Sequence, residues 1–130
     1  MRALSAYRGF IKESATVIAG DFNDNVKWDR PTKLNKHRTN VSELTALGLR
    51  SAYHHDRGVE QGAEREPTIY WRNRKSDGPS YHIDYCFVPE SWTKTLSVEV
   101  GRFDEWVHLS DHVPLTVEVG HLSSVPWRSA

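Results

Sequence analysis

Five side chains that can do acid–base or metal chemistry lie in three short segments of this chain, each beside or within a predicted strand. They are Asp21, Asn23, Asp84, Asp111 and His112. Carboxylates, an amide and an imidazole that converge on one point are the groups used when a metal ion assists the attack of water on a phosphate ester.

Three of these residues suit distinct parts of a phosphate-ester reaction. Asp111 offers the hard carboxylate oxygen that Mg²⁺ prefers, whereas His112 changes protonation near neutral pH and is a candidate general base for water. Adjacent residues of an extended chain point to opposite sides, so we expect Asp111 to face the metal and His112 the nucleophile. The amide of Asn23 can donate a hydrogen bond to a phosphate oxygen, where charge builds up during displacement.

Each of these residues also has a purely structural interpretation. Asp21 follows a glycine at the end of an apolar run, and an aspartate there often closes a turn with its own side chain. Asn23 is equally typical of a loop, and an Asp-His pair such as Asp111 and His112 is usually a surface feature.

Asp84 lies inside a predicted strand whose alternation places it on the same face as His82 and Cys86. A carboxylate in an otherwise apolar strand is costly unless it is paired. Its natural partner is an imidazole, which it would orient and hold in one tautomer. The alternative is a polar row on the solvent face of an edge strand.

A basic segment between two predicted strands is a candidate substrate-binding loop. It contains Trp71, Arg72, Arg74 and Lys75. Positive charges beside an aromatic ring can contact a nucleic-acid backbone and stack on a base, although a solvated hairpin turn is an equally good interpretation. The basic stretch 33–38, in the long loop after Asn23, is a second such candidate.

Composition limits the classes of protein that need to be considered. The 130 residues fit one domain, and 17 basic residues balance 17 acidic ones, so any phosphate binding must be local. A single cysteine excludes an internal disulfide, and His54, His55 and His82 lack the spacing of a closed zinc site. No apolar stretch approaches the roughly 20 residues that span a bilayer, and no signal-peptide region is seen. These features predict a soluble, cytoplasmic protein.

Hydrophobic periodicity predicts more strands than helices. Helices are expected over residues 4–13 and from the capping-box-like segment 40–43 to Gly48, loops over 23–40 and 54–66, and strands over 16–19, 49–53, 68–71, 81–88, 96–100 and 113–119. The strands 68–71 and 81–88 are expected to form a hairpin. The pattern predicts an α+β domain over residues 1–120, followed by a frayed tail over 121–130.

Three segments, taken in order, resemble the late motifs of the endonuclease/exonuclease/phosphatase superfamily, which includes pancreatic deoxyribonuclease, exonuclease III and sphingomyelinases. They are Gly20-Asp21-Phe22-Asn23, Ile83-Asp84-Tyr85 and Ser110-Asp111-His112-Val113-Pro114-Leu115. Their intervals of about 60 and 27 residues also fit, and the resemblance covers about residues 7–119. It implies the C-terminal half of a four-layer αββα sandwich, with mostly antiparallel sheet and flanking helices.

The resemblance also implies a reaction and a role for each motif residue. Members hydrolyse phosphodiesters or phosphomonoesters with a divalent metal, usually Mg²⁺, with Mn²⁺ as an alternative. Asp21 would position or activate the attacking water, Asn23 would contact the scissile phosphate, and Asp111 would help to bind the metal. His112 would contact the phosphate or act as the base, oriented by Asp84. Whether Asp21 or His112 takes the proton stays open.

One departure from the superfamily pattern concerns the metal. Members are usually about twice as long, and their first half carries a metal-binding glutamate. Here 15 residues precede the strand before Asp21, and Glu13 is the sole upstream acid. We expect that Met1 begins within a larger domain or that the gene is truncated, so that a sheet face needs a partner chain or self-association. The alternative function is therefore a non-catalytic fragment or interaction module that keeps the late motifs.

Overall fold

The central strand of the fold is β5 (Asp84–Pro89), which is buried on both faces. The structure, a computed structural model, describes residues 2–75 and 77–120, so the tail expected over 121–130 lies outside the described residues. Antiparallel pairing joins β5 to β1 (Ile18–Asp21) on one side and to β2 (Leu49–Ser51) on the other. Two smaller antiparallel pairs complete the strands: β3 (Ile69–Tyr70) with β4 (Ser80–Tyr81), and β6 (Leu96–Val100) with β7 (Leu115–Val119).

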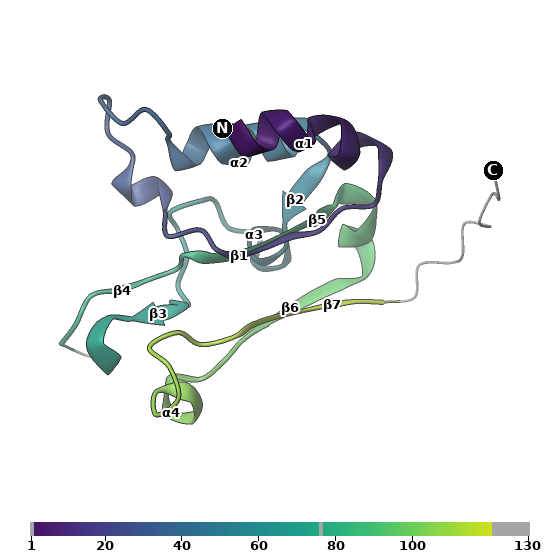
Figure 1. The fold of residues 1–130 in the computed structure, drawn as a ribbon. Coiled ribbons are helices and arrows are strands. Elements are labelled where there is room, and N and C mark those ends of the chain that lie inside the picture. Colours follow the sequence, from purple (N-terminus) through teal and green to yellow (C-terminus); the bar gives the residue numbers. More distant parts are fainter. Residues whose placement is uncertain (1, 76, 121–130) are drawn as a thin grey trace.

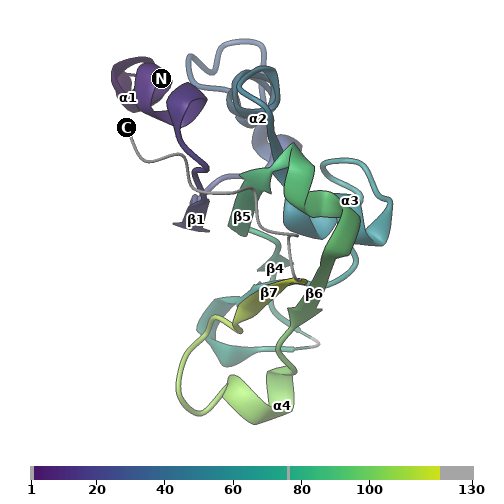
Figure 2. The same cartoon turned by 90° about the vertical axis from the view of Figure 1, so that its right-hand side faces the viewer.

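Helices and strands cover opposite faces of the three-stranded sheet. Helices α1 (Arg2–Glu13) and α2 (His37–Ala46) lie on one face, and the β6–β7 pair lies on the other (Figures 1 and 2). A third helix, α3 (Ala52–Arg57), packs against β5 and β6. The remaining elements are short: η1 (Val26–Trp28), η2 (Trp71–Asn73), η3 (Glu90–Thr95) and α4 (Phe103–Trp106).

The alternation of β5 divides the core into two parts. Tyr85 and Phe87 pack with apolar side chains of α1 and α2, whereas Cys86 and Val88 pack with α3 and β6. Asp84 belongs to the second set by the same period of two, and so it faces the β6–β7 side. The position of Asp84 in the strand therefore decides on which side of the sheet a site can form.

The coarse fold prediction is confirmed, because the chain is a small α+β protein with antiparallel sheets and a few helices. The interpretation of Asp84 as part of an edge strand is wrong, since β5 is the middle strand of its sheet. The predicted hairpin forms only in part. Ile69 pairs with Tyr81, but the strand expected over 81–88 is interrupted, and its second part pairs with β1 and β2 instead.

Two other boundaries differ from the sequence prediction for physical reasons. Helix α2 begins at His37 and not at the capping-box segment, because Asp29 accepts hydrogen bonds from the backbone N–H groups of His37 (2.7 Å) and Arg38 (3.0 Å). A carboxylate from outside the helix thus caps it. The loop expected over 54–66 starts with α3, which Gly58 ends in the left-handed conformation at φ 59°.

A further property of the helices concerns membranes. Over residues 2–75 and 77–120, no helix is both long enough and apolar enough to cross a bilayer.

Candidate active site

The imidazole of His112 and the carboxylate of Asp84 form a hydrogen-bonded pair. The two atoms, Nδ1 of His112 and Oδ2 of Asp84, lie 2.9 Å apart. Because an ionised carboxylate can only accept, Nδ1 carries the proton and Nε2 of the neutral ring keeps its lone pair. A general base needs this tautomer. An imidazole is also the partner that the sequence predicted for Asp84.

The main chain around His112 is fixed on both sides. A β-bridge pairs His112 with Ile69, and the His112 N–H donates to the hydroxyl of Ser110 (3.0 Å). The next residue, Val113, donates its N–H to the carbonyl of Thr68 (2.9 Å). His112 is thus placed by backbone contacts as well as by its carboxylate partner.

Asp21 lies directly opposite Asp84 in the antiparallel pairing of β1 with β5. Directly opposed residues share one face, with Cβ atoms about 5 Å apart, so two carboxylates lie side by side there. Hydrogen bonds oppose their repulsion. Asn23 donates its backbone N–H to Asp21 Oδ1 (2.7 Å) and its side-chain amide to Oδ2 (3.0 Å), and His112 donates to Asp84. Asp21 therefore closes a turn through its hydrogen bonds with Asn23, and it also lies beside the Asp84–His112 pair.

The backbone before and after Asp21 is unusual. Gly20 has φ 143°, which side-chain-bearing residues rarely adopt, and Asn23 has φ 49°. A Cβ atom built on Gly20 would meet no atom within 4 Å. Backbone conformation, and not lack of space, is thus what requires glycine before the carboxylate.

A cleft of about 560 Å³ adjoins the pair and lies between the three-stranded sheet and the β7 side. Its lining includes Asp84, Ser110 and His112 at the polar end, and apolar side chains elsewhere, such as Trp106 and Leu115. The volume is typical of a small-molecule site. Asp21, Asn23 and Asp111 are not part of this lining.

The donor groups near the pair can be compared with what Mg²⁺ needs. Asp111 and Asp21 carry hard carboxylate oxygens, and Mg²⁺ commonly takes only one or two protein carboxylates together with water and phosphate oxygens. In the part of the chain that the structure describes, no three His, Cys, Asp or Glu residues are grouped so as to hold a metal ion. The donor chemistry therefore fits Mg²⁺, with only part of its ligands drawn from these residues.

Thr68 is a positioning residue that the sequence analysis missed. Its side chain is fully buried, and its hydroxyl oxygen accepts the N–H groups of both Ile83 and Asp84 (3.1 Å each). Its carbonyl holds Val113, and its N–H donates to the carbonyl of Tyr81 (2.8 Å). One residue thus fixes both the segment of Asp84 and the segment of His112, and no spacing in the sequence indicates this.

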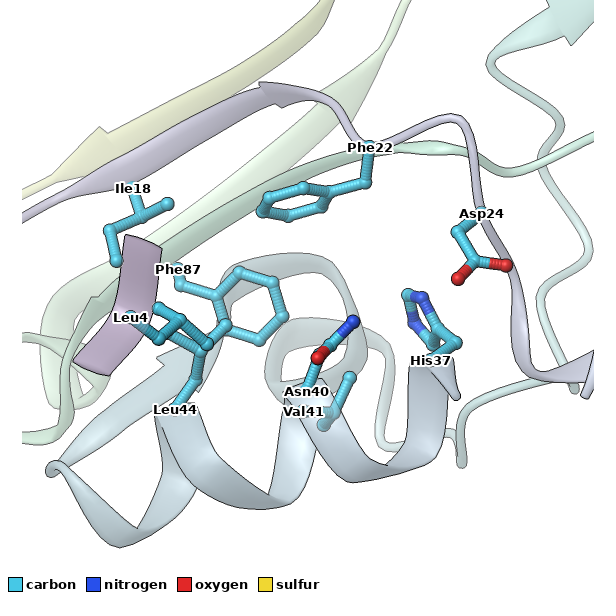
Figure 3. A pocket seen from close by; sticks show the side chains of 9 residues that line it. All are labelled: Leu4, Ile18, Phe22, Asp24, His37, Asn40, Val41, Leu44 and Phe87. Atoms are coloured by element: carbon cyan, nitrogen blue, oxygen red, sulfur yellow. The ribbon is translucent and has the colours of Figure 1, made fainter. Parts of the chain in front are cut away.

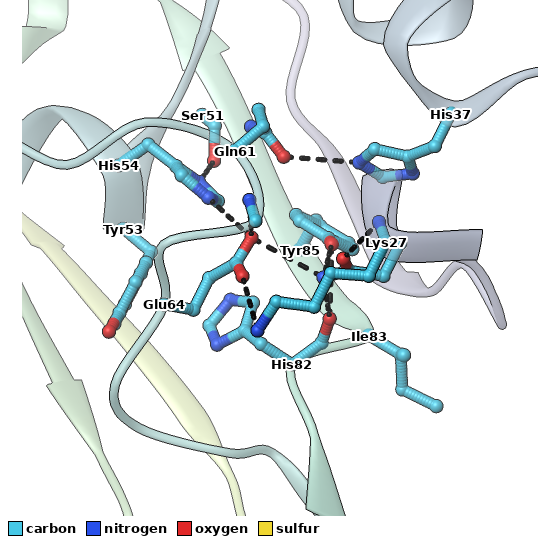
Figure 4. A network of polar contacts seen from close by, with 12 residues as sticks. Lys27, His37, Ser51, Tyr53, His54, Gln61, Glu64, His82, Ile83 and Tyr85 are labelled. Carbon is cyan, nitrogen blue, oxygen red and sulfur yellow. Dashed lines mark hydrogen bonds and ion pairs between the residues drawn. The ribbon is translucent and has the colours of Figure 1, made fainter. Parts of the chain in front are cut away.

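A second set that the sequence analysis missed is a buried polar network around Glu64 (Figure 4). The carboxylate is 2% exposed, and its Oε1 accepts from His54 Nε2 (3.0 Å), the Gly62 N–H (2.8 Å) and Asn25 Nδ2 (3.3 Å). Asn25 Nδ2 also lies 3.0 Å from the carbonyl of His82. These hydrogen bonds connect the segment after α3 with the residues that directly precede β5.

The titration of the network follows from these contacts. Burial by itself raises the pKa of Glu64, but hydrogen bonds from His54 and backbone N–H groups outweigh it and lower the pKa to about 2. His82 donates Nδ1–H to the carbonyl of Glu66 (2.9 Å), and burial lowers its pKa. His82 is therefore a core residue, and the partner of Asp84 is His112.

The basic segment is connected to the segment of His112 through the backbone of Tyr70. The N–H of Tyr70 donates to the carbonyl of Asp111 (2.8 Å), and η2 begins at the next residue, Trp71, which is 50% exposed. Arg72 has a left-handed φ of 56°. Lys75 lies 3.4 Å from Asp104 and over the ring of Phe103.

Two other cations have acidic neighbours. Arg74 Nη1 lies 3.7 Å from Asp77, and Lys33, in the second basic stretch, pairs with both Asp24 and Asp29. Carboxylates thus lie beside cations of both basic stretches. The segment from Trp71 to Lys75 differs in that it directly follows Tyr70, whose N–H donates to the carbonyl of Asp111.

Comparison with known proteins assigns neither a family nor a function to this chain. The chain matches no model of a protein family, and no curated protein gives a significant match. The superfamily resemblance thus stays a prediction that depends on the three motifs.

Replacing Thr68 by valine should lower the unfolding free energy, because two hydrogen bonds at the site are lost. Valine keeps the shape but removes the hydroxyl, so the Ile83 and Asp84 N–H groups lose their acceptor, and we expect a loss of about 1–3 kcal/mol in unfolding free energy. Urea denaturation would measure the loss, and amide hydrogen exchange at Asp84 would locate it. Thr68→Ser keeps the oxygen and is the control. Equal losses and equal exchange in the two variants would refute the role of the hydroxyl.

The low pKa of Glu64 predicts that part of the unfolding free energy is lost at acidic pH. A carboxyl whose pKa falls from 4.5 to about 2 on folding stabilises the protein fully above pH 4.5 and loses this effect as the pH falls toward 2. At 1.36 kcal/mol for each pKa unit, the effect is about 3 kcal/mol. Glu64→Gln should therefore flatten the pH dependence of unfolding free energy over this range.

The exposed residue Glu60 offers a matched control, since Glu60→Gln removes the same charge outside the network. Chemical denaturation at intervals from pH 7 to pH 2 would compare the two variants with the parent. An acid dependence in Glu64→Gln that equals that of Glu60→Gln would contradict the assignment.

Proposed function

We propose that this chain carries the acid–base pair of a metal-dependent phosphoesterase, and in particular of a nuclease-like enzyme that hydrolyses phosphodiesters with an activated water. The observation that supports this most is the pairing of His112 Nδ1 with Asp84 at 2.9 Å. The pair lines an open cleft and has a second carboxylate, Asp21, directly opposite Asp84.

In the proposed reaction, Nε2 of His112 accepts a proton from the attacking water, and Asp84 stabilises the imidazolium that forms. Both oxygens of Asp21 already accept hydrogen bonds from Asn23, so we assign the proton to His112 and leave Asp21 to orient the water. The Asn23 amide has a second N–H that can donate to the phosphate as charge builds up.

A divalent metal, Mg²⁺ or Mn²⁺, would be held in part by Asp111 and would draw negative charge away from the phosphate oxygens. We propose that its other protein ligand belongs to a partner chain or to a further segment. This proposal follows from the carboxylates available near the pair, which supply only some of the oxygens that such an ion needs.

A nucleic acid is the substrate that the basic segment favours. Trp71, Arg72, Arg74 and Lys75 are exposed and follow directly on the strand that is hydrogen-bonded to Asp111. An aromatic ring and cations at one edge of a site can bind a phosphodiester backbone and stack on a base. As predicted from the sequence, we also propose a cytoplasmic location for the protein.

A second candidate function, an interaction module, has an observation of its own. Strand β1 is at the edge of its sheet and is mostly exposed, and exposed apolar side chains lie along α1 and just before β1, namely Tyr7, Phe10 and Val17. An exposed edge strand can pair with another chain. A partner chain or a second copy that covers this edge would serve binding, whether or not the pair is catalytic.

Substitution of the pair tests the catalytic proposal. His112→Ala or Asp21→Asn should lower Mg²⁺-dependent hydrolysis by roughly 10² or more, the scale for losing a positioned acid–base group. We would measure turnover of bis(p-nitrophenyl) phosphate and of a DNA duplex, with the chain alone and with a complementing, glutamate-bearing first half. His108→Ala removes an exposed histidine nearby and serves as the control. Unchanged hydrolysis in both site variants would overturn the assignments.

Removal of the basic side chains tests the substrate class. Replacing Arg72, Arg74 and Lys75 together by alanine should weaken DNA binding and make its salt dependence shallower, because fewer counterions are released. Fluorescence anisotropy of a labelled duplex at several salt concentrations measures both. The triple change Lys33→Ala, Lys36→Ala and Arg38→Ala removes the same charge from the other basic stretch. A salt slope equal to that of the parent would exclude the Arg72–Lys75 segment from DNA binding.

A further inference from the structure

A cavity of about 280 Å³ lies between α1, α2 and the helix-covered face of the sheet (Figure 3). Its lining shares no residue with the cleft beside the Asp84–His112 pair. Its walls are mainly apolar and come from four elements, α1, β1, α2 and β5, and from the turn after β1. These side chains are Leu4, Ile18, Phe22, Val41, Leu44 and Phe87. The cavity is close to the lower end of the volumes seen for small-molecule sites, so it suits a ligand of fragment size.

Three polar side chains gather at one end of this cavity, namely Asp24, His37 and Asn40 (Figure 3). Asn40 Oδ1 is buried and has no hydrogen-bond partner among the described residues. An unpaired buried acceptor costs about 1–3 kcal/mol, so a donor that reaches it would bind favourably.

His37 also presents an acceptor. The side chain is 3% exposed, and its Nε2 lies 3.1 Å from the amide oxygen of Gln61. Because that oxygen can only accept, Nε2 carries the proton and Nδ1 keeps its lone pair. Burial outweighs the neighbouring carboxylates and lowers the pKa of His37, which keeps the ring neutral at pH 7.

The charged side chain that lines this end is the carboxylate of Asp24. Lys33 Nζ lies 2.5 Å from Asp24 and 3.6 Å from Asp29, so two carboxylates face one ammonium. Asp24 Oδ1 accepts from Lys33 and from the Asn25 N–H (2.9 Å). A cationic donor therefore complements the Asp24 carboxylate and the unpaired Asn40 Oδ1 at this end.

From these observations we propose that the cavity binds a small primary amine with an apolar body, such as an arylalkylamine. The ammonium group donates to Asn40 Oδ1, to His37 Nδ1 and to the carboxylate of Asp24, and the hydrocarbon body fills the space against Phe22, Leu44 and Phe87. An ammonium has three donors and no acceptor, which matches the three acceptors named here, namely Asn40 Oδ1, His37 Nδ1 and the Asp24 carboxylate. This site is separate from the proposed catalytic one and does not depend on it.

The test compares 2-phenylethylamine with 2-phenylethanol, which has the same body but no charge and only one donor. We expect the amine to bind at least tenfold more tightly at pH 7, because charge-assisted hydrogen bonds are about twice as strong as neutral ones. Titration followed by ¹⁵N–¹H NMR would give both dissociation constants. The shifted amide signals should lie in α2 and around Phe22.

Two variants and a control make the test specific. Asn40→Leu replaces the unpaired acceptor by an apolar group of similar shape, and Asp24→Asn removes the charge. Each should weaken amine binding about tenfold and alcohol binding by less, so that the ratio of the two constants falls. Glu118→Gln removes an exposed charge from β7 and should change neither constant. Far-ultraviolet circular dichroism checks that each variant is folded, and if one is not, the other still decides the result.

Three results would overturn the proposal. In the first, the amine binds no more tightly than the alcohol. In the second, neither ligand gives saturable shifts in α2. In the third, Asn40→Leu and Asp24→Asn leave the ratio of the two constants unchanged. Because none of these measurements uses phosphate-ester hydrolysis, their outcome is independent of the proposed enzyme activity.

Discussion

Four hydrogen bonds of one buried residue, Thr68, hold the two halves of the candidate site together. Its hydroxyl and main chain join the segments of Tyr81, Asp84 and Val113, which lie 13, 16 and 45 residues further along the chain. Because a buried N–H group without a partner is costly, each of these segments can hardly move without the others. The short distance between Asp84 and His112 is therefore a property of this junction as much as of the two side chains themselves.

The alternation of β5 gives the protein two chemically different sides. On the side of β6 and β7, Asp84 faces an imidazole, with Asp21 on the adjacent strand. On the helix side, Tyr85 and Phe87 contribute to an apolar core that contains the second cavity. A shift of β5 by one residue in register would exchange its two sets of side chains and turn Asp84 into the apolar core, so the pairing of β5 with β1 is strongly specified.

Much of the candidate site followed from the sequence because its signals are local. A glycine and an aspartate after an apolar run, and an aspartate in a buried strand, can each be recognised within a few residues, as Asp21 and Asp84 show. The α+β class followed from strand periodicity for the same reason. By contrast, Asn25 and Glu64 meet across 39 residues, and Asp29 caps a helix that begins eight residues later. Such contacts depend on the folded chain, which no local pattern describes.

Gly20 illustrates how handedness can matter more than size. Its backbone has φ 143°, while the space where a side chain would begin is open. An L-residue is disfavoured there by its own main chain, whereas the mirror-image form of the same residue would adopt this conformation readily. Alanine in the ordinary L form at this one position would therefore force the main chain out of its conformation and change the direction in which β1 delivers its terminal carboxylate.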